Sequence, residues 1–412
     1  MEAIILAGGL GTRLRSELVD LPKSMAPINN RPFMEYLLDR LILNGVTRVI
    51  FSVGYKSDHI QNYFSNQYKS CEIEYAVEET LLGTGGAIKN AMRFACDNDV
   101  VVLNGDSIFY SDLKAQYNLH ISTKADVTLA LKWMNKNDRY GTVEISDEGK
   151  ITRFLEKQAI DEGYISMGNY IFNVNSFNEL SLPEKFSIEK DFFETKVDQL
   201  NLVGYKADGY FLDIGIPEAF KRAQLEIGVF QEIDKSWTLF LDRDGVINVK
   251  RDNDYVKNIE EFEFLPGAPE AIASLSELFG KIIIVTNQQG IGKGLMSEED
   301  LTKVHDNLKQ MVSEHGGHID AIFHAPQRAS ENSKMRKPEI GMASQAKEDY
   351  PEIDFSQSIM IGDSASDMEF ATRAEMIPVM VTESEEYPEY SIDSLKAFSD
   401  LLNSILRPTK KL

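Results

Sequence analysis

Residues 2–14 read Glu-Ala-Ile-Ile-Leu-Ala-Gly-Gly-Leu-Gly-Thr-Arg-Leu, and in them an apolar stretch runs directly into a glycine-rich turn. The apolar part, Ala3–Leu6, predicts a buried strand. The glycines let the backbone pass close to a phosphate chain, so that its N–H groups can point at the anion. Arg13 and Lys23 supply cations beside the turn. The stretch therefore predicts a strand that ends at a phosphate-binding site.

Two better-known phosphate loops do not fit this turn. The dinucleotide fingerprint would need a further glycine three residues after Gly11, where Leu14 stands. A Walker loop is excluded because no Gly-Lys-Ser/Thr follows. A plain tight turn is the remaining alternative, and the two cations beside the turn weaken it.

Apolar strands and helix-like stretches alternate through the first half of the chain. Phe33–Asn44 has apolar residues at helical spacing and is closed by Gly45. The expected buried strands are Ala3–Leu6, Arg48–Val53, Val100–Leu103 and Val127–Leu131. Such alternation predicts an α/β fold with a mostly parallel sheet.

The same pattern restarts at residues 236–242, Ser-Trp-Thr-Leu-Phe-Leu-Asp, where an apolar strand again ends in an acidic turn. Ile282–Thr286 and Ile359–Ile361 are further strands of this second series. A chain of 412 residues is long enough for two hydrophobic cores. We therefore expect two Rossmann-like α/β domains, residues 1–228 and 236–406, joined by a short helical connection.

Composition excludes several classes of function. The chain has 43 Lys and Arg against 65 Asp and Glu, a formal net charge of −22, which disfavours binding to a nucleic-acid backbone. The only two cysteines, Cys71 and Cys96, exclude a disulfide framework and a four-cysteine zinc site. No apolar run approaches the ~20 residues of a membrane span, and the N-terminus lacks the basic region of a signal peptide. We expect a cytoplasmic protein without nucleic-acid or membrane partners; a homo-oligomer stays open.

Two acidic residues of the first half stand where α/β sheets bind ligands. Asp106 follows an apolar strand directly, and Asp213 lies in a similar setting, Tyr210–Gly215. Two such carboxylates, if they converge, would hold Mg²⁺ against phosphate oxygens. Taken singly, each could equally cap a helix or a turn.

Residues 1 to about 225 resemble the sugar-1-phosphate nucleotidyltransferase family. The resemblance covers the whole half in six ordered motifs: Leu6–Leu14 with Lys23, Leu82–Ala87, Leu103–Asp106, Arg139–Gly141, Phe154–Lys157 and Tyr210–Gly215. It implies a nucleotidyltransferase fold in which a sugar phosphate attacks the α-phosphorus in line and pyrophosphate leaves. Positioning and charge neutralisation are enough for such a transfer, so no protein nucleophile is needed.

The resemblance also assigns residues. It implies that Arg13 and Lys23 act on the phosphates and that Asp106 and Asp213 bind Mg²⁺. The implied nucleotide-binding residues are Leu6, Ala7, Gly8, Gly9, Gly11, Thr12, Arg13, Lys23, Glu78, Gly83, Thr84, Gly85 and Asp106. The implied sugar-phosphate residues are Gly141, Glu156, Lys157 and Asn169. The segment that follows Leu14 is most similar to the heptose-1-phosphate guanylyltransferase branch, which implies GTP; UTP, CTP and dTTP stay open as alternatives.

The second half carries four polar motifs in sequence, and we expect each of them at the end of a strand. In Asp242-Arg243-Asp244 the first carboxylate could act as nucleophile and the second as acid and base, although Asp-x-Asp is also a common loop pattern. Thr286-Asn287-Gln288 offers a hydroxyl and amides to phosphate oxygens. Arg336-Lys337 supplies cations, and residues 362–367 supply further carboxylates.

These motifs resemble the haloacid dehalogenase superfamily over about residues 237–385, within it the heptose bisphosphate and histidinol phosphate phosphatases. The resemblance implies that Asp242 attacks phosphorus and forms an aspartyl phosphate, while Asp244 protonates the leaving oxygen and then activates water. It further implies these binding roles: phosphoryl contacts from Thr286, Asn287, Gln288 and Lys337, distal substrate contacts from Tyr255 and Arg336, and Mg²⁺ on Asp242, the carbonyl of Asp244, and Asp363. Asp367 is a weaker candidate for the metal; capping a helix or supporting the metal ligands is an at least equal expectation.

One departure from this branch concerns zinc. Its members often carry three cysteines and a histidine before the Arg-Lys-Pro motif, but here the region Phe323–Arg336 has no cysteine. His324 alone cannot form a tetrahedral site, so no zinc is expected. We expect His324, and equally His305, His315 and His318, to be loop or surface residues.

Together the two resemblances predict a bifunctional enzyme of nucleotide-sugar biosynthesis. Its second half would remove the C7 phosphate of D-glycero-D-manno-heptose 1,7-bisphosphate. Its first half would then activate heptose 1-phosphate to GDP-heptose for glycan assembly, with Mg²⁺ at both sites. The same pairing on another sugar, or a regulatory nucleotide-binding protein with one inactive half, are the alternatives.

Overall fold

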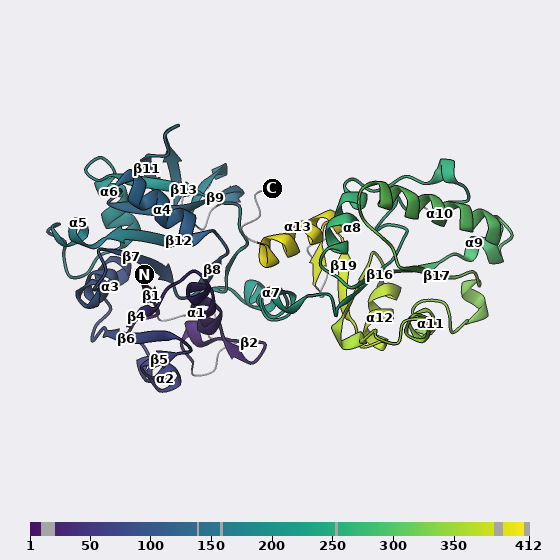
Figure 1. Cartoon of the computed structure of the whole chain (residues 1–412), viewed down its shortest axis with the longest axis horizontal. Coiled ribbons are helices and arrows are strands. Elements are labelled where there is room, and N and C mark those ends of the chain that lie inside the picture. Colours follow the sequence, from purple (N-terminus) through teal and green to yellow (C-terminus); the bar gives the residue numbers. More distant parts are fainter. Residues whose placement is uncertain (10–20, 138–139, 157–159, 252–253, 383–389, 408–412) are drawn as a thin grey trace. The chain divides into compact units, whose positions relative to one another are not determined.

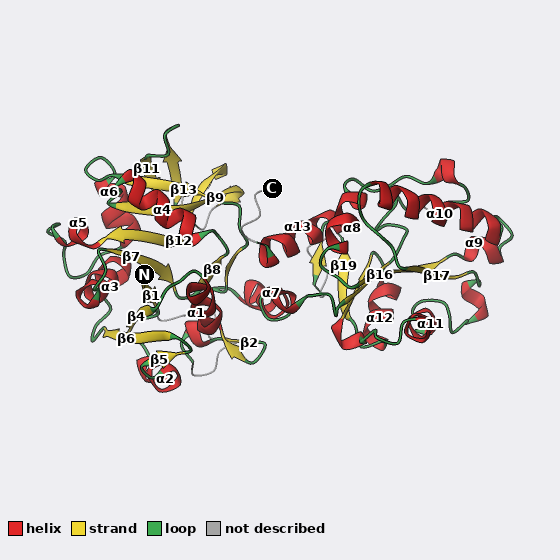
Figure 2. Ribbon diagram, in the orientation of Figure 1, coloured by secondary structure: helices red, strands yellow, loops and turns green. Residues whose placement is uncertain are grey.

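The computed structural model describes residues 1–9, 21–137, 140–156, 160–251, 254–382 and 390–407 (Figure 1). The chain divides into two compact units: Met1–Gln231 with the residues from Ser404 onward, and Glu232–Asn403. Each unit combines helices with a central sheet, so the expected α/β class is confirmed in both (Figure 2). No described helix is both long enough and apolar enough to cross a bilayer.

The described strands of the first unit form a mixed ten-stranded sheet. Its order is β11-β10-β12-β7-β1-β4-β6-β5, and β9 pairs with β12 and β13. The strands are β1 (Glu2–Leu6), β4 (Arg48–Val53), β5 (Gln67–Tyr68), β6 (Cys71–Val77), β7 (Asp99–Asn104), β9 (Val127–Asn137), β10 (Thr142–Ile145), β11 (Ile151–Leu155), β12 (Ile160–Asn173) and β13 (Leu202–Lys206). Two small ribbons, β2 (Pro27–Ile28) with β3 (Arg31–Pro32) and β8 (Ser107–Phe109) with β14 (Phe211–Asp213), lie outside it.

All four strands expected in this half are present, but the sheet is less parallel than predicted. β7, β1, β4 and β6 run parallel, and β12 pairs antiparallel with β7 and with β9. β9 extends six residues beyond the predicted end at Leu131, because its second half pairs with β12. The buried parallel strands are continuous apolar runs, which are easy to recognise in the sequence. The half-exposed part of β9 that pairs with β12 has a weaker apolar pattern, so its extent was not predicted.

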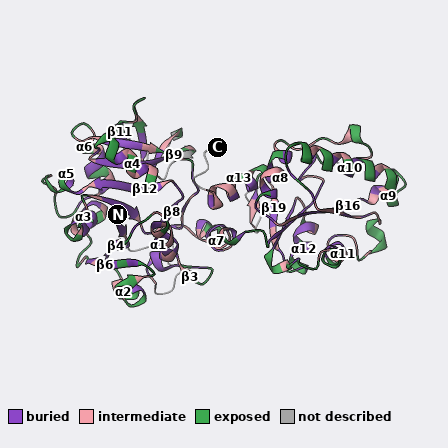
Figure 3. Ribbon diagram, in the orientation of Figure 1, coloured by how far each residue is buried: buried purple, intermediate pink, exposed green. Residues whose placement is uncertain are grey.

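Helices cover the faces of this sheet. They are α1 (Phe33–Leu43), α2 (Ser57–Phe64), α3 (Gly83–Ala91), α4 (Leu113–Thr123), α5 (Val174–Asn178), α6 (Glu194–Lys196) and α7 (Pro217–Glu226), with shorter turns at Lys23–Met25, Met92–Phe94, Ile188–Phe193 and Phe230–Glu232. The predicted helix Phe33–Asn44 is α1, which ends at Leu43 and has Asn44 as its C-cap. The buried core runs along the strands (Figure 3), and Phe172, Phe192 and Phe193 are among its fully buried side chains.

The second unit has an entirely parallel sheet in the order β17-β16-β15-β18-β19-β20. Its strands are β15 (Thr238–Leu241), β16 (Lys281–Asn287), β17 (Ala321–Ala325), β18 (Ser358–Gly362), β19 (Ile377–Val381) and β20 (Ser391–Ile392). Its helices are α8 (Ala268–Ser276), α9 (Gln289–Gly292), α10 (Glu298–Glu314), α11 (Gly341–Asp349) and α12 (Ala365–Arg373), and α13 (Leu395–Leu406) begins in it. Figure 1 shows α8 and α10 on one face of this sheet and α11 and α12 on the other.

Strand order explains where the polar side chains gather. In the first unit β1 lies between β4 and β7, and in the second β15 lies between β16 and β18, so chain order reverses at β1 and at β15. In open α/β sheets, ligands bind at the carboxyl ends of the strands where the order reverses. The glycine-rich turn follows β1 and Asp242 follows β15, so both predicted sites stand at such a point.

Candidate active sites

A cavity of about 420 Å³ opens at the carboxyl ends of β1 and β7. Most of the predicted nucleotide-binding residues line it. Its lining comprises Leu6, Ala7, Gly8, Gly9, Lys23, Ser24, Glu78, Leu81, Gly83, Thr84, Ala87, Asn104, Gly105, Asp106, Asp213 and Gly215. The structure therefore brings segments from both ends of the first unit to one pocket.

Glu78 lies beside the glycine turn and is held from two sides. A Cβ on Gly8 would lie 2.7 Å from Oε1 of Glu78, so a larger residue there would force that carboxyl group to shift. Glu78 accepts hydrogen bonds from the hydroxyl of Ser52 (3.2 Å) and from the backbone N–H of Leu82 (3.2 Å). Burial raises the pKa of Glu78, and these two bonds oppose the rise. Glu78 thus connects β4, through Ser52, to the start of α3.

Asp106 and Asp213 are more than a hundred residues apart but lie together because β8 and β14 pair. The register of this ribbon sets Asp213 opposite Ser107, and the N–H of Ile214 donates to the carbonyl of Asp106 (3.0 Å). The ammonium of Lys23 lies between the two carboxylates, 2.6 Å from Asp106 Oδ2 and 3.3 Å from Asp213 Oδ1. The two carboxylates thus share one positive charge between their oxygens, and carboxylate oxygens are also the ligands that Mg²⁺ takes.

A second cavity of about 400 Å³ adjoins the first. The two share Thr84, Asn104, Asp106 and Asp213 in their linings. The second is also lined by Ser107, Tyr140, Gly141, Phe154, Glu156, Ser166, Met167, Gly168, Tyr170, Ser187, Glu189 and Phe211. Two ligands, one in each cavity, would therefore meet at the two carboxylates.

Glu189 is a residue of the second cavity that no sequence motif singled out. Its Oε2 accepts hydrogen bonds from the hydroxyls of Thr84 and Ser187, each at 2.9 Å. Thr84 also accepts a bond from the N–H of Ile188 (2.9 Å). Because Thr84 lines both cavities, this contact joins the two pockets through one side chain.

Other predicted residues of the first unit lie differently. Gly85 is outside both cavity linings; its N–H donates to the carbonyl of Phe186 (3.0 Å), and a Cβ would collide with the Phe186 ring. Asn169 is buried on β12, where it pairs with Leu103 of β7. Its sequence neighbours Gly168 and Tyr170 line the second cavity, but Asn169 does not. Gly11, Thr12, Arg13 and Lys157 lie outside the described residues.

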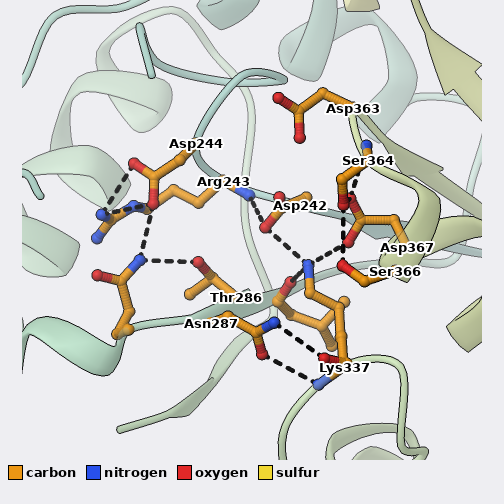
Figure 4. A network of polar contacts seen from close by, with 12 residues as sticks. Asp242, Arg243, Asp244, Thr286, Asn287, Lys337, Asp363, Ser364, Ser366 and Asp367 are labelled. Carbon is orange, nitrogen blue, oxygen red and sulfur yellow. Dashed lines mark hydrogen bonds and ion pairs between the residues drawn. The ribbon is translucent and has the colours of Figure 1, made fainter. Parts of the chain in front are cut away.

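In the second unit Asp242 follows β15 and is held by a buried lysine (Figure 4). Its Oδ1 accepts a bond from the N–H of Arg243 (2.8 Å) and lies 2.8 Å from Nζ of Lys337. Nζ of Lys337 also contacts Oδ1 of Asp367 (2.6 Å) and the carbonyl of Val285 (2.8 Å). Burial raises the pKa of Asp242 to about 7; Asp367 and Asp244 add to the rise, and Lys337 opposes it.

Asp244 is fixed by donors on both of its oxygens. Oδ1 accepts from Arg243 Nη2 (3.0 Å) and Asn248 Nδ2 (2.9 Å), and Oδ2 accepts from the same Nη2 (3.0 Å) and from Gln288 Nε2 (2.8 Å). Burial works to raise the pKa of Asp244, but the charge of Arg243 and these bonds outweigh it, so the pKa lies below its usual value.

Three carboxylates of the second unit lie close enough to hold one metal ion. Among the described residues, Asp242, Asp363 and Asp367 offer oxygens within 4.8 Å of one another. Within the described structure Asp363 Oδ1 is buried without a hydrogen-bond partner, while its Oδ2 pairs with Lys250 (2.6 Å). An orphaned carboxylate oxygen beside two further carboxylates fits a hard divalent cation. Asp367 also caps α12 through Ser364, as expected from the sequence.

The other predicted phosphatase residues surround Asp242 but bind mainly to protein groups. Thr286 Oγ1 accepts a bond from Gln288 (2.8 Å), which leaves its own hydroxyl proton to donate. The amide of Asn287 exchanges two bonds with the backbone of Lys337 (3.0 and 3.2 Å). Asn287 thus holds the loop that carries Lys337.

Tyr255 and Arg336 lie near each other at the edge of this site. Burial lowers the pKa of Arg336, and Tyr255 opposes that shift. Arg336 Nη1 is buried without a hydrogen-bond partner among the described residues, and the hydroxyl of Tyr255 accepts a bond from Lys293 (2.9 Å). Lys293 is a further cation of this group that the sequence did not single out.

The expectation that His305 is a surface residue is wrong. The ring is 8% exposed, and its Nε2 lies 3.1 Å from Arg243 Nη1. Burial, with help from Arg243 and His324, lowers the pKa of His305 to about 3. A signal was present, because His305 stands on the apolar stripe of α10, between Leu301 and Leu308. His315 and His318 are exposed as expected.

Each half of the chain matches a known protein family. Residues 2–228, more than half of the chain, match the family described as nucleotidyl transferase. The chain belongs to the nucleotidyl transferase family. Residues 238–392 match a second family, described as polynucleotide kinase 3 phosphatase.

Individual relatives of this nucleotidyl transferase family member match the same two halves of the chain. A D-glycero-alpha-D-manno-heptose 1-phosphate guanylyltransferase of Aneurinibacillus thermoaerophilus is 49% identical over 227 residues, 55% of this chain and 98% of that relative. A D-glycero-alpha-D-manno-heptose-1,7-bisphosphate 7-phosphatase of Mycobacterium tuberculosis is 41% identical over 143 residues, 35% of this chain and 75% of that relative. The crystal structure of HddC from Yersinia pseudotuberculosis, 32% identical, matches 55% of this chain and 99% of its own with a TM-score of 0.50.

These matches confirm the predicted pairing of folds. The first half has the nucleotidyltransferase fold, and the second has a haloacid dehalogenase-like phosphatase fold. The chain is an enzyme with nucleotidyltransferase and phosphatase activities.

Proposed function

We propose that the chain carries out two consecutive steps in the synthesis of GDP-heptose. The domain of residues 236–406 removes the C7 phosphate of D-glycero-D-manno-heptose 1,7-bisphosphate. The domain of residues 1–228 then transfers GMP from GTP to the remaining 1-phosphate and releases pyrophosphate. The observation that carries the proposal is the pair of adjoining cavities whose shared lining contains Asp106 and Asp213. The relatives of the two halves support the choice of substrate.

The transfer step needs only that two anions meet in line. The nucleotide lies in the first cavity, with its base beside Glu78, Gly83 and Thr84 and its phosphates along the backbone of Gly8 and Gly9. The sugar phosphate lies in the second cavity, beside Gly141, Glu156 and the buried Asn169. Its oxygen attacks the α-phosphorus, and the bond from that phosphorus to pyrophosphate breaks. Lys23 neutralises phosphate charge where the cavities join, and we assign the same task to Arg13.

In the phosphatase step, Asp242 attacks the phosphorus of the C7 phosphate. Among the described residues, the contacts of Asp242 with Arg243 and Lys337 both go to Oδ1, so Oδ2 is the attacking oxygen. The bond from phosphorus to the sugar oxygen breaks, and Asp244 gives that oxygen a proton. Asp244 then takes a proton from water, which attacks the aspartyl phosphate and frees inorganic phosphate.

The remaining residues bind and orient the substrate. The hydroxyl of Thr286 donates to a phosphoryl oxygen, while Lys337 fixes Asp242 and Asn287 fixes Lys337. Gln288 orients both Thr286 and Asp244 by donating a hydrogen bond to each. Arg336 and Tyr255 contact the distal part of the sugar phosphate.

Each site would hold one Mg²⁺, on Asp106 and Asp213 in the first unit and on Asp242, the carbonyl of Asp244, and Asp363 in the second. When bound, Mg²⁺ supplies positive charge that neutralises the phosphate oxygens.

The nucleotide specificity is tested by a screen of triphosphates with heptose 1-phosphate. GTP should give the fastest pyrophosphate release, since the first half is most similar to guanylyltransferases. The measurement is pyrophosphate release with GTP, UTP, CTP and dTTP in parallel, with mass analysis of the nucleotide sugar. Faster release with another triphosphate would refute the assignment of GTP, and no release with any of them would refute the proposed transfer.

Removal of metal should stop both activities without any sign of zinc. EDTA removes Mg²⁺, so phosphate release and pyrophosphate release should both fall to background, and added Mg²⁺ should restore them. Elemental analysis of the purified protein should find no stoichiometric zinc, because the region Phe323–Arg336 contains no cysteine. One tightly bound zinc per chain would show that this region has been misread.

A further inference from the structure

Arg243 is a fully buried arginine between the two catalytic aspartates of the phosphatase site, and the mechanism above gives it no task. Its side chain is 0% exposed, and its Nε has no hydrogen-bond partner within the described structure. An arginine cannot lose its proton to escape the cost of burial. The charge is therefore kept inside the protein by the groups around it.

Those groups are Asp244 on one side and His305 on the other. Nη2 of Arg243 lies 3.0 Å from each oxygen of Asp244, so this one nitrogen is shared by both oxygens of the carboxylate. Nη1 lies 3.1 Å from Nε2 of His305, on α10. Because a guanidinium only donates, Nε2 of His305 must be the acceptor, and the proton of that ring is on Nδ1. α10 thus reaches the acid–base residue through one arginine.

This chain of contacts leaves Asp244 one orientation. A carboxylate can rotate about its bond to Cβ, and neutral amides hold its two oxygens, Asn248 on Oδ1 and Gln288 on Oδ2. Arg243 adds a charged donor to both oxygens, which opposes that rotation more strongly. His305 in turn stops the guanidinium from turning away.

We propose that Arg243, held by His305, is a positioning residue that fixes the carboxylate of Asp244 for proton transfer in the phosphatase reaction. The inference rests on the proposed aspartyl-phosphate mechanism. It predicts that loss of either contact harms the reaction only where a proton must be transferred. A sugar alkoxide leaves poorly without a proton, whereas p-nitrophenolate leaves readily without one.

The test compares two substrates in three variants of the full-length protein with Mg²⁺. Arg243→Lys keeps the charge but has one nitrogen in place of the two that contact Asp244 and His305. His305→Leu removes the acceptor, and His305→Gln can replace it with an amide oxygen. The exposed His318→Leu is the control. For each protein we would measure the pre-steady-state burst of p-nitrophenolate from p-nitrophenyl phosphate, which reports attack by Asp242, and the single-turnover cleavage of heptose 1,7-bisphosphate.

In Arg243→Lys and His305→Leu, cleavage of the bisphosphate should fall about tenfold or more, while the rate of the burst should change less than about threefold. His305→Gln should recover much of the loss, and His318→Leu should match wild type. Equal losses with both substrates, or no loss with either, would overturn the positioning role. Release of p-nitrophenolate by Asp242→Asn protein at the wild-type rate would instead overturn the aspartyl-phosphate mechanism. Where Arg243→Lys fails to fold, by circular dichroism, the two His305 variants decide the question.

Discussion

Asp242→Asn should reduce phosphate release from heptose 1,7-bisphosphate roughly 10⁴-fold or more, because it removes the nucleophile itself. An amide is a poor nucleophile, and it also takes one negative charge from the group formed by Asp242, Asp363 and Asp367. Nucleotidyl transfer from GTP to heptose 1-phosphate should be unchanged, because its two cavities are lined by residues of the first unit alone. Both rates can be measured on one preparation, as phosphate and as pyrophosphate.

The matched control for this variant is Asp400→Asn, the same chemical change on α13. Asp400 is exposed and pairs only with Lys396 among the described residues, so its loss should cost less than about 1 kcal/mol of stability and no activity. Phosphate release by Asp242→Asn within a few fold of wild type would mean that another group attacks phosphorus. Loss of both activities in Asp242→Asn would instead indicate misfolding.

The positions of the candidate catalytic carboxylates could be predicted because they depend on a rule of topology. Asp106, Asp242 and Asp363 each follow a buried parallel strand, and such strands bring their carboxyl ends to one edge. Short apolar runs reveal these strands, and β4 was predicted to the residue. The position of Asp213 beside Asp106 was inferred only from resemblance, because the pairing of β8 with β14 leaves no pattern in the sequence.

Residues that act through tertiary contacts could not be predicted in the same way. Glu189 reaches the second cavity from an irregular turn at Ile188–Phe193, which carries no motif. The sequence shows that Asn287 and Gln288 follow a strand, but not that both amides bind protein groups. His305 is on the buried side of α10, and its partner Arg243 lies 62 residues away, so no local spacing could pair them. The sequence thus predicts which edge is catalytic, and the structure adds what holds the catalytic groups.

Asp106→Ala should stop the coupled reaction at heptose 1-phosphate, because the two steps should run opposite to the order of the domains along the chain. Given the bisphosphate, Mg²⁺ and GTP, wild-type protein should make phosphate, pyrophosphate and GDP-heptose. Asp106→Ala should make phosphate at the normal rate and pyrophosphate about 10²-fold more slowly or worse, since metal-held charge supplies several kcal/mol and each 1.4 kcal/mol is tenfold. Mass analysis of the sugar products distinguishes these outcomes.

The charge of the second cavity gives the physical reason for this order. Its described lining includes Asp106, Glu156, Glu189 and Asp213 but no Lys or Arg. The one cation assigned to the sugar phosphate is Lys157, which lies outside the described residues, and it serves the 1-phosphate. A second phosphate at C7 would have no second cation assigned to it among these carboxylates, and an unpaired charge is costly to bury. The bisphosphate should therefore be a poor substrate for transfer until the phosphatase has acted. Asp242→Asn protein given bisphosphate and GTP is the decisive comparison: it should leave the bisphosphate largely untouched, and efficient formation of a nucleotide-linked heptose that still bears its C7 phosphate would reverse the order argued here.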